Sequence, residues 1–275
     1  TLEAIRALVR PMSSYYSNLI EGHATQPADI ERALRKDLSA DPAQRALQLE
    51  GRAHVEVQTL IEGKLKEGGI RPCSREFLCW IHREFYERMP AEFRTVRGAH
   101  GTEDRVRPGG LRTSEVEVGH HTAPAAASLE AFLTRFEEGY DFGARDPLER
   151  VVAAAAAHHR LVWIHPFLDG NGRVARLFTD AHLAAAGVEG LGIWTMSRGF
   201  ARRRDAYLSA LARADETRRD DLDGRGNLSD EGLRAFCLFL LATALDQTRF
   251  MTGLLALDAL REALAAREPA VIIAR

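Results

Sequence analysis

The chain has 275 residues, of which 45% are hydrophobic and 28% are charged, and its formal net charge is −2 at pH 7. These values are those of an ordinary globular protein and exclude a disordered tail, and the near-neutral charge gives no overall attraction for nucleic acid or anionic lipid. No apolar run reaches the roughly 20 residues that span a bilayer, and no signal segment opens the chain. We therefore expect a cytoplasmic protein without a membrane partner.

The cysteines and the chain ends give less information. Cys73, Cys79 and Cys237 are too few and too scattered for a disulfide framework or a zinc site, so we interpret them as core thiols. The chain starts at Thr1 rather than Met and stops within the apolar run 270–274, which leaves room for a further domain.

Helix-forming patterns dominate the first part of the chain. Apolar residues recur at three-to-four spacing in residues 2–9, and residues 28–38 mix charged residues with strong helix formers. Between these segments Gly22 is suited to end a helix, which places Glu21 at a helix end. An apolar helical stripe follows at residues 77–89, where a proline stops it.

The chain changes character between residues 94 and 124, where glycine is frequent. Here Glu115-Val116-Glu117-Val118-Gly119 alternates acidic and apolar residues, a pattern typical of a half-exposed strand or hairpin. Helical patterns then return in four segments, 129–136, 148–161, 173–186 and 197–214. A polar loop at 220–227, which we interpret as a solvated turn, leads to Ser229, a suitable cap for a long apolar helix through Leu245 and beyond. The patterns predict an all-α fold with a short hairpin.

The residues suited to chemistry lie together in His165-Pro166-Phe167-Leu168-Asp169-Gly170-Asn171-Gly172-Arg173-Val174-Ala175-Arg176. Gly170 and Gly172 permit backbone conformations closed to other residues, so successive N–H groups and the N-terminus of the next helix can converge on one anion. Arg173 and Arg176 lie about one turn apart and can contact a polyphosphate together. This segment predicts a site for the phosphate chain of a nucleotide.

Two side chains add a metal ligand and a base to this site. Asp169 offers a hard oxygen ligand where a phosphate-bridging Mg²⁺ needs one protein carboxylate. His165, with an ordinary pKa of about 6.5, suits the removal of a proton from a hydroxyl at neutral pH. A base, a metal ligand and a phosphate cradle in one loop imply phosphoryl or nucleotidyl transfer.

His165 to Arg176 matches the signature H-x-F-x-[DE]-G-N-G-R-x-x-R without departure, so the chain resembles the Fic family of protein adenylyltransferases. The resemblance implies an all-α Fic-type bundle with a short β-hairpin flap. In this division N-terminal helices occupy 1–90, the Fic catalytic core 91–250 and a C-terminal helical extension 251–275. Doc-type kinases, a related branch, carry Ala and Lys where this chain has Gly170 and Gly172, so kinase chemistry is not expected.

The resemblance also implies a reaction and roles for residues. Fic proteins transfer AMP from ATP, with Mg²⁺, to a Ser, Thr or Tyr hydroxyl of a protein target. Here His165 would be the catalytic base, Asp169 would hold Mg²⁺, and the segment 116–119 would be the flap that aligns the target backbone by strand addition. The nucleotide-binding residues would be Val116, Glu117, Val118, Gly119, Asp169, Gly170, Asn171, Gly172, Arg173, Arg176, Tyr207 and Asp215.

An inhibitory motif is expected near the N-terminus. Ser17-x-x-x-Glu21-Gly22 matches the pattern [ST]-x-x-x-E-[GN] that precedes the catalytic core in many Fic proteins. In the family this glutamate pairs with the second motif arginine, here Arg176, and keeps the γ-phosphate from binding productively. Autoinhibition by Glu21 is therefore implied, although the same carboxylate could instead orient a water for the removal of AMP.

Alternative functions and partners stay open. The same site could serve a de-AMPylating hydrolase or a nucleotide-sensing regulator, although an intact His165 argues against a pure sensor because binding needs the loop and not the base. Self-modification and a homodimer are compatible with the sequence. Longer Fic proteins often carry a DNA-binding domain after the core, so nucleic acid is a partner only if such a domain is missing beyond Arg275.

Overall fold

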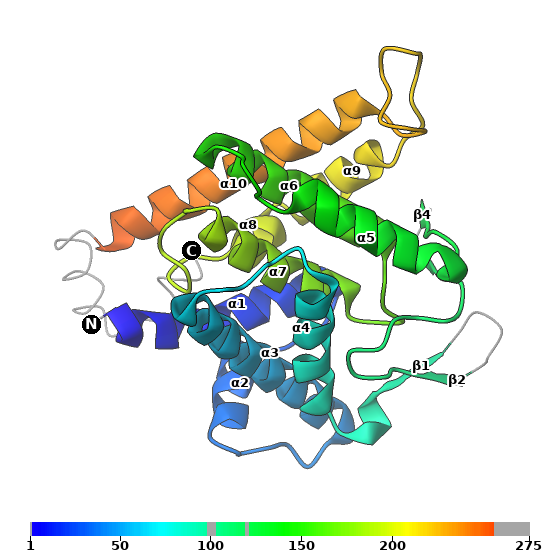
Figure 1. The fold of residues 1–275 in the computed structure, drawn as a ribbon. Coiled ribbons are helices and arrows are strands. Elements are labelled where there is room, and N and C mark those ends of the chain that lie inside the picture. Colours follow the sequence, from blue (N-terminus) through cyan, green and yellow to red (C-terminus); the bar gives the residue numbers. More distant parts are fainter. Residues whose placement is uncertain (1, 98–102, 119–120, 256–275) are drawn as a thin grey trace.

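The computed structural model describes residues 2–97, 103–118 and 121–255, and ten α-helices build this part of the chain (Figure 1). In chain order they are α1 (Leu2–Glu21), α2 (Pro27–Leu34), α3 (Pro42–Glu67), α4 (Arg75–Glu87), α5 (Leu129–Tyr140), α6 (Pro147–Ile164), α7 (Asn171–Ala185), α8 (Met196–Arg202), α9 (Arg204–Ala214) and α10 (Asp230–Leu255). The expected all-α fold is confirmed. The predicted C-terminal extension lies mostly outside the described residues.

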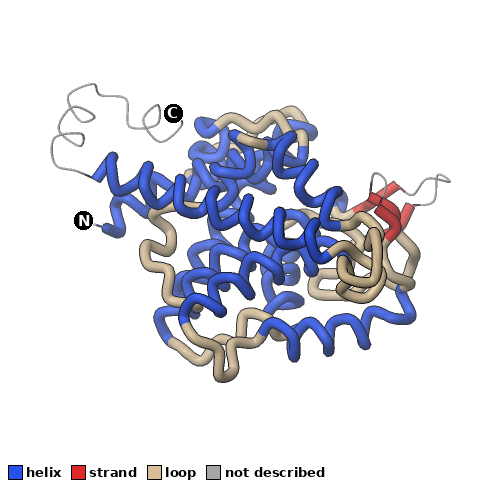
Figure 2. The backbone as a smooth tube through the Cα atoms, turned by 90° about the horizontal axis from the view of Figure 1, so that it is seen from above, coloured by secondary structure: helices blue, strands red, loops and turns tan. Residues whose placement is uncertain are grey.

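Four short strands form two antiparallel hairpins at one side of the helical body (Figure 2). The strand β3 (Glu117–Val118) pairs with β4 (His121–Thr122), which confirms the hairpin expected around residue 117, while Gly119 lies outside the described residues. The pair β1 (Thr95–Arg97) and β2 (Glu103–Arg105) was not expected, because all three residues of β2 are exposed and charged and give no apolar alternation.

The helix α7 lies at the centre, with α1, α3 and α4 on one side and α6 on the other (Figure 1). Two hydrophobic clusters fill the interior, and α6 and α7 contribute to both. The alanine run of α6 makes this possible, since Ala154, Ala155 and Ala157 are completely buried and let neighbouring helices approach closely. The loop that joins α6 to α7 is therefore held between two packed helices.

The segment 197–214, expected as one helix, is two helices that meet at Arg203, so this prediction was wrong. Two aromatic rings explain the break. In a continuous helix, residues seven apart are separated by about 10 Å along the axis. The bend at Arg203 instead lets Phe200 and Tyr207 stack with their ring centroids 4.2 Å apart.

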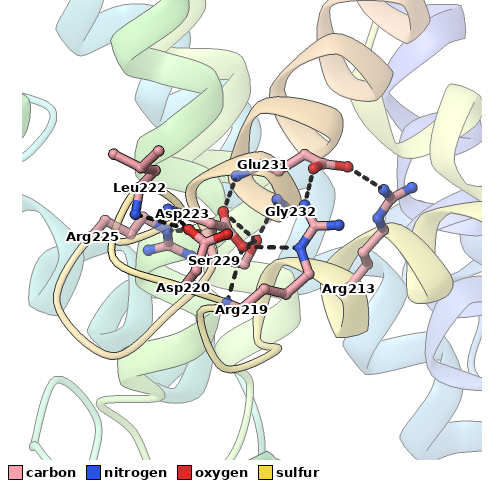
Figure 3. Close-up of polar contacts among 9 residues, drawn as sticks. All are labelled: Arg213, Arg219, Asp220, Leu222, Asp223, Arg225, Ser229, Glu231 and Gly232. Atoms are coloured by element: carbon pink, nitrogen blue, oxygen red, sulfur yellow. Dashed lines mark hydrogen bonds and ion pairs between the residues drawn. The ribbon is translucent and has the colours of Figure 1, made fainter.

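The loop between α9 and α10 is ordered by hydrogen bonds and by an ion pair of Asp223 with Arg219 (Figure 3). The carboxylate of Asp223 accepts hydrogen bonds from Ser229 Oγ at 3.0 Å and from the Glu231 amide at 2.9 Å. Ser229 Oγ accepts from the Gly232 amide at 2.9 Å, which confirms Ser229 as the helix cap. Among the residues that the structure describes, no group of three or more side chains is placed to hold a metal ion, in this loop or elsewhere.

A helix that crosses a bilayer needs about 20 consecutive apolar residues. None of the helices in the described ranges is both long and apolar enough to cross one.

Candidate functional site

The loop from His165 to Gly170 is fixed by hydrogen bonds to its own backbone. The helix α6 ends at His165, whose left-handed conformation (φ 50°, ψ 61°) turns the chain away from the helix axis. Asn171 then accepts from the Phe167 amide at 2.9 Å and donates to the Phe167 carbonyl at 2.8 Å. The ring of Phe167 is fully buried and stacks on His82, with centroids 4.0 Å apart. Asn171 thus shapes the loop.

The two glycines are required for different reasons. Gly170 has φ +79°, and a Cβ there would lie 2.8 Å from the ring of Tyr86, so both the conformation and the space demand glycine. Gly172 lies in the first turn of α7, where a Cβ would collide with the carboxylate of Glu21 and lie 3.0 Å from Arg176 Nη1. The Glu21 carboxylate therefore sits against the N-terminus of α7, the end of a helix that attracts anions.

His165 is neutral and carries a free lone pair on one nitrogen. Its Nδ1 lies 3.3 Å from the carbonyl of Val162, which can only accept, so Nδ1 bears the hydrogen and Nε2 is unprotonated. Burial lowers the pKa of His165 to about 4. At neutral pH this imidazole can accept a proton at Nε2.

Asp169 is the half-exposed carboxylate of the site. Its Oδ2 accepts a hydrogen bond from the Tyr86 hydroxyl at 2.5 Å and lies 3.9 Å from Arg173 Nη1. The backbone carbonyl of Asp169 accepts from His82 Nε2 at 3.3 Å, because His82 Nδ1 accepts from a backbone amide. With 49% of the side chain exposed, the carboxylate can serve as the one protein ligand that a phosphate-bound Mg²⁺ requires.

Arg176 is fully buried and is occupied by residues of α1. Its Nη2 donates to Glu21 Oε1 at 2.5 Å and to the Ser17 carbonyl at 3.2 Å. Its Nε donates to Ser17 Oγ at 3.0 Å. Partial burial raises the pKa of Glu21, but the charges of Arg176 and Arg173 outweigh this effect and lower it below its ordinary value. The geometry expected for an inhibitory glutamate is thus present.

Arg173 pairs with a carboxylate that the sequence reasoning missed. Its Nη2 lies 3.0 Å from Oε1 of Glu50, a buried residue of α3. The same Glu50 oxygen accepts from His23 Nδ1 at 3.0 Å. Sequence offered no signal for this pair, because the two residues lie on distant helices and neither motif includes Glu50.

The flap hairpin is attached to the end of α6. His121 of β4 donates from Nε2 to the Trp163 carbonyl at 2.8 Å, and the carbonyl of Val116 accepts from the Ala123 amide at 3.3 Å. Glu117 is exposed. Nucleotide contact by Val116, Glu117 and Val118 stays a prediction.

Arg112, also missed, connects the flap to the catalytic loop. Its side chain is fully buried and donates to three backbone carbonyls, those of His165 (2.8 Å), Ser114 (2.9 Å) and Pro124. Its own amide donates to the Pro166 carbonyl at 3.0 Å. The loop that bears His165 and both ends of the flap therefore share one guanidinium.

Tyr207 and Asp215 each contact a buried histidine, and Tyr207 also lies close to the motif arginine Arg176. Tyr207 is buried, and its hydroxyl lies 2.8 Å from His158 Nε2. Asp215 accepts from His159 Nε2 at 2.8 Å. Contact of these two side chains with a nucleotide stays a prediction, and both now have a structural role as partners of buried histidines.

Comparison with known protein families matches residues 72–183 to the Fic/DOC family. Over 112 residues the chain is 40% identical to the protein adenylyltransferase Fic of Drosophila willistoni and 33% identical to that of Drosophila ananassae. Each match covers 39% of this chain and 22% of the relative, so the chain spans less than a quarter of these relatives. The range matched to the family, residues 72–183, contains His165 to Arg176 but not Glu21 or Glu50.

Solved structures give the same fold. A Fic-domain-containing signaling protein from Bacteroides thetaiotaomicron superimposes with a TM-score of 0.68 at 21% identity, covering 91% of this chain and 88% of that one. A Fic family protein from Desulfovibrio desulfuricans gives 0.62 at 19% identity, covering 96% and 66%. The helical fold, the unbroken motif and the match at residues 72–183 together identify this chain as one that carries a Fic/DOC family domain.

Proposed function

We propose that this chain is a protein adenylyltransferase, which transfers AMP from ATP to a Ser, Thr or Tyr hydroxyl of a protein target. One observation carries the proposal: a neutral His165 with its lone pair on Nε2 stands in the same loop as the glycine-lined N-terminus of α7 and two buried arginines. The names of the relatives that are 40% and 33% identical to this chain over 112 residues support it. They favour transfer over the reverse hydrolysis.

In the proposed reaction His165 Nε2 takes the proton of the target hydroxyl while the hydroxyl oxygen attacks the α-phosphorus of ATP. A new phosphorus–oxygen bond forms, the bond between the α-phosphorus and its bridging oxygen breaks, and pyrophosphate leaves with that electron pair. Because the pKa of His165 is about 4, the base is ready without prior deprotonation, and Nδ1–H to Val162 holds its orientation.

The phosphates would be held by the first turn of α7. The backbone N–H groups of Gly170 to Gly172 lie at a helix N-terminus, and Arg173 and Arg176 add two positive charges. A buried donor is available there, since Arg173 Nε has no hydrogen-bond partner among the described residues. Asp169 fits the single carboxylate ligand of a Mg²⁺ ion, which would offset the negative charge of the phosphates.

Glu21 would hold this site in an inhibited state. A carboxylate 2.5 Å from Arg176 and in contact with the Gly172 position occupies the space and the donors that a terminal phosphate would use. ATP must displace it before Arg176 can contact phosphate. We expect the wild-type protein to be largely silent.

The remaining expectations from the sequence stay predictions. They are the division at residues 90 and 250, strand addition of the target to the flap, self-modification, a homodimer and a cytoplasmic location. The flap proposal is supported by β3, whose exposed Glu117 belongs to a two-residue strand paired on one side with β4.

Incubation with ATP labelled in the α-phosphate tests the function. Glu21→Gly should raise AMP transfer, including self-modification, by at least about tenfold, an effect of ~1.4 kcal/mol, and Glu21→Gly with His165→Ala should abolish it. Glu67→Gly is the matched control, because Glu67 also ends a helix ahead of a glycine with positive φ but is not the partner of Arg176. Equal labelling of all variants, or none with Glu21→Gly, would refute the proposed function.

A further inference from the structure

Two carboxylates from the N-terminal helices reach the motif arginines, and only Glu21 belongs to a recognisable motif. The second, Glu50, lies on α3 with 8% of its surface exposed. It sits 3.0 Å from Arg173 Nη2, and Arg173 itself is only 6% exposed. Burial of a guanidinium without a counter-charge costs several kcal/mol, and Glu50 is nearer to Arg173 than the second carboxylate, Asp169, which lies 3.9 Å away.

Glu50 stands on a rigid part of α3. At the next residue, Gly51, a Cβ would lie 2.8 Å from Ile30 Cγ1, so α3 packs directly on α2 here. The Gly51 carbonyl accepts from Ser14 Oγ at 3.0 Å, which joins the same turn to α1. The backbone that carries Glu50 is therefore held in place by two neighbouring helices, α1 and α2.

Glu50 engages only one edge of Arg173. Its contact uses Nη2, while Nη1 lies 3.9 Å from Asp169 Oδ2 and Nε has no hydrogen-bond partner among the described residues. Glu21 differs, since it contacts Arg176 from the position where Gly172 opens the helix end. Glu50 therefore leaves donors of Arg173 available, whereas Glu21 occupies the approach to Arg176.

We propose that Glu50 is a positioning residue, which fixes the guanidinium of Arg173 so that its remaining donors meet the nucleotide phosphates. The proposal rests on the proposed function of the same site. Glu50 acts in the active protein and stays in place when Glu21 is displaced. Loss of Glu50 therefore weakens phosphate binding, the opposite of the effect of losing Glu21.

His23 extends this arrangement to the inhibitory segment. It follows Glu21 by two residues and donates to the same Glu50 oxygen at 3.0 Å. The Glu50 hydrogen bond raises the pKa of His23, against the opposing effect of burial. Glu50 thus contacts both Arg173 and, through His23, the turn that follows Glu21.

The test compares Glu21→Gly with Glu21→Gly/Glu50→Gln, and measures binding of ADP and of adenosine by calorimetry and the KM for ATP in AMP transfer. We expect Glu50→Gln to weaken ADP binding and to raise the KM for ATP by about tenfold or more, and to leave adenosine binding unchanged. A merely structural role would weaken adenosine and ADP equally. Glu62→Gln is the control, since Glu62 is a buried carboxylate of the same helix that pairs with Arg10 at 2.7 Å, outside the site.

Every other outcome would overturn the positioning role of Glu50, the proposed function, or both. Unchanged ADP binding and KM after Glu50→Gln refute the positioning role, and tighter binding identifies Glu50 as a second inhibitory carboxylate instead. If Glu21→Gly binds ADP but transfers no AMP, the proposed function falls and the ADP measurements still decide the role of Glu50. If no nucleotide binds Glu21→Gly, both proposals fall.

Discussion

Two arginines of α7 meet carboxylates from the N-terminal helices, yet the two pairs are built differently. Arg173 meets Glu50, a buried residue in the middle of α3, whereas Arg176 meets Glu21, the last residue of α1, whose side chain is 32% exposed. A carboxylate in the middle of a packed helix stays with its partner, but one at a helix end, next to solvent, can be displaced by a competing anion. The same kind of ion pair can therefore position one arginine and block the other.

The largest expected effect of this difference is on stability. Glu50→Gln leaves the Arg173 charge buried, and we expect it to lower the free energy of unfolding by about 3 kcal/mol. Glu21→Gln removes a carboxylate whose side chain is 32% exposed and leaves the buried Arg176 with its hydrogen bonds to Ser17, so its expected cost is smaller, about 1 kcal/mol. Urea unfolding measures both, with the exposed Glu67→Gln as a control expected within about 0.5 kcal/mol of wild type. Equal costs for the two pairs would show that their burial does not distinguish them.

The second expected effect is on the pH dependence of AMP transfer, which depends on His165 and not on the two ion pairs. Because burial lowers the pKa of His165 to about 4, its neutral form persists as pH falls from 8, and protonation removes the base only near pH 4. AMP transfer by Glu21→Gly should thus stay constant from pH 8 to about 5 and then fall about tenfold per pH unit below 4. Initial rates at saturating ATP measure this, with ADP binding at each pH as the control. A midpoint at about 6.5 would contradict the buried state of the base.

The smallest effect tests the connection between flap and loop. In the Glu21→Gly background, Arg112→Lys keeps the charge but cannot reach three carbonyls, and the loss of about one net hydrogen bond should slow transfer about fivefold. ADP binding should not change, since Arg112 contacts the His165 loop and not the two pairs. Transfer rates and ADP affinities are compared with those of Arg107→Lys, an exposed residue near Arg112. Weaker ADP binding would place Arg112 in the phosphate site instead.

The sequence predicted the features that depend on residues close together in the chain. The residues His165 to Arg176 are contiguous, so the candidate base, the candidate metal ligand, the glycines and the arginines could be recognised together. Glu21 was predicted from the short pattern Ser17-x-x-x-Glu21-Gly22, whose residues also lie close together in the chain. Glu50 and Arg112 could not be found in this way, because their partners come from other elements and a lone Glu or Arg in a chain gives no signal. The break at Arg203 was missed for the same reason, since it depends on the stacking of Phe200 on Tyr207.

The central claim, that Glu50 and Glu21 act on the two arginines in opposite directions, is tested most directly by AMP transfer from α-labelled ATP at subsaturating concentration. Wild type, Glu21→Gly and Glu21→Gly/Glu50→Gln are compared side by side. We predict that transfer rises at least about tenfold in the single variant and falls back by a similar factor in the double variant. Transfer in the double variant that equals or exceeds that of Glu21→Gly would contradict the account.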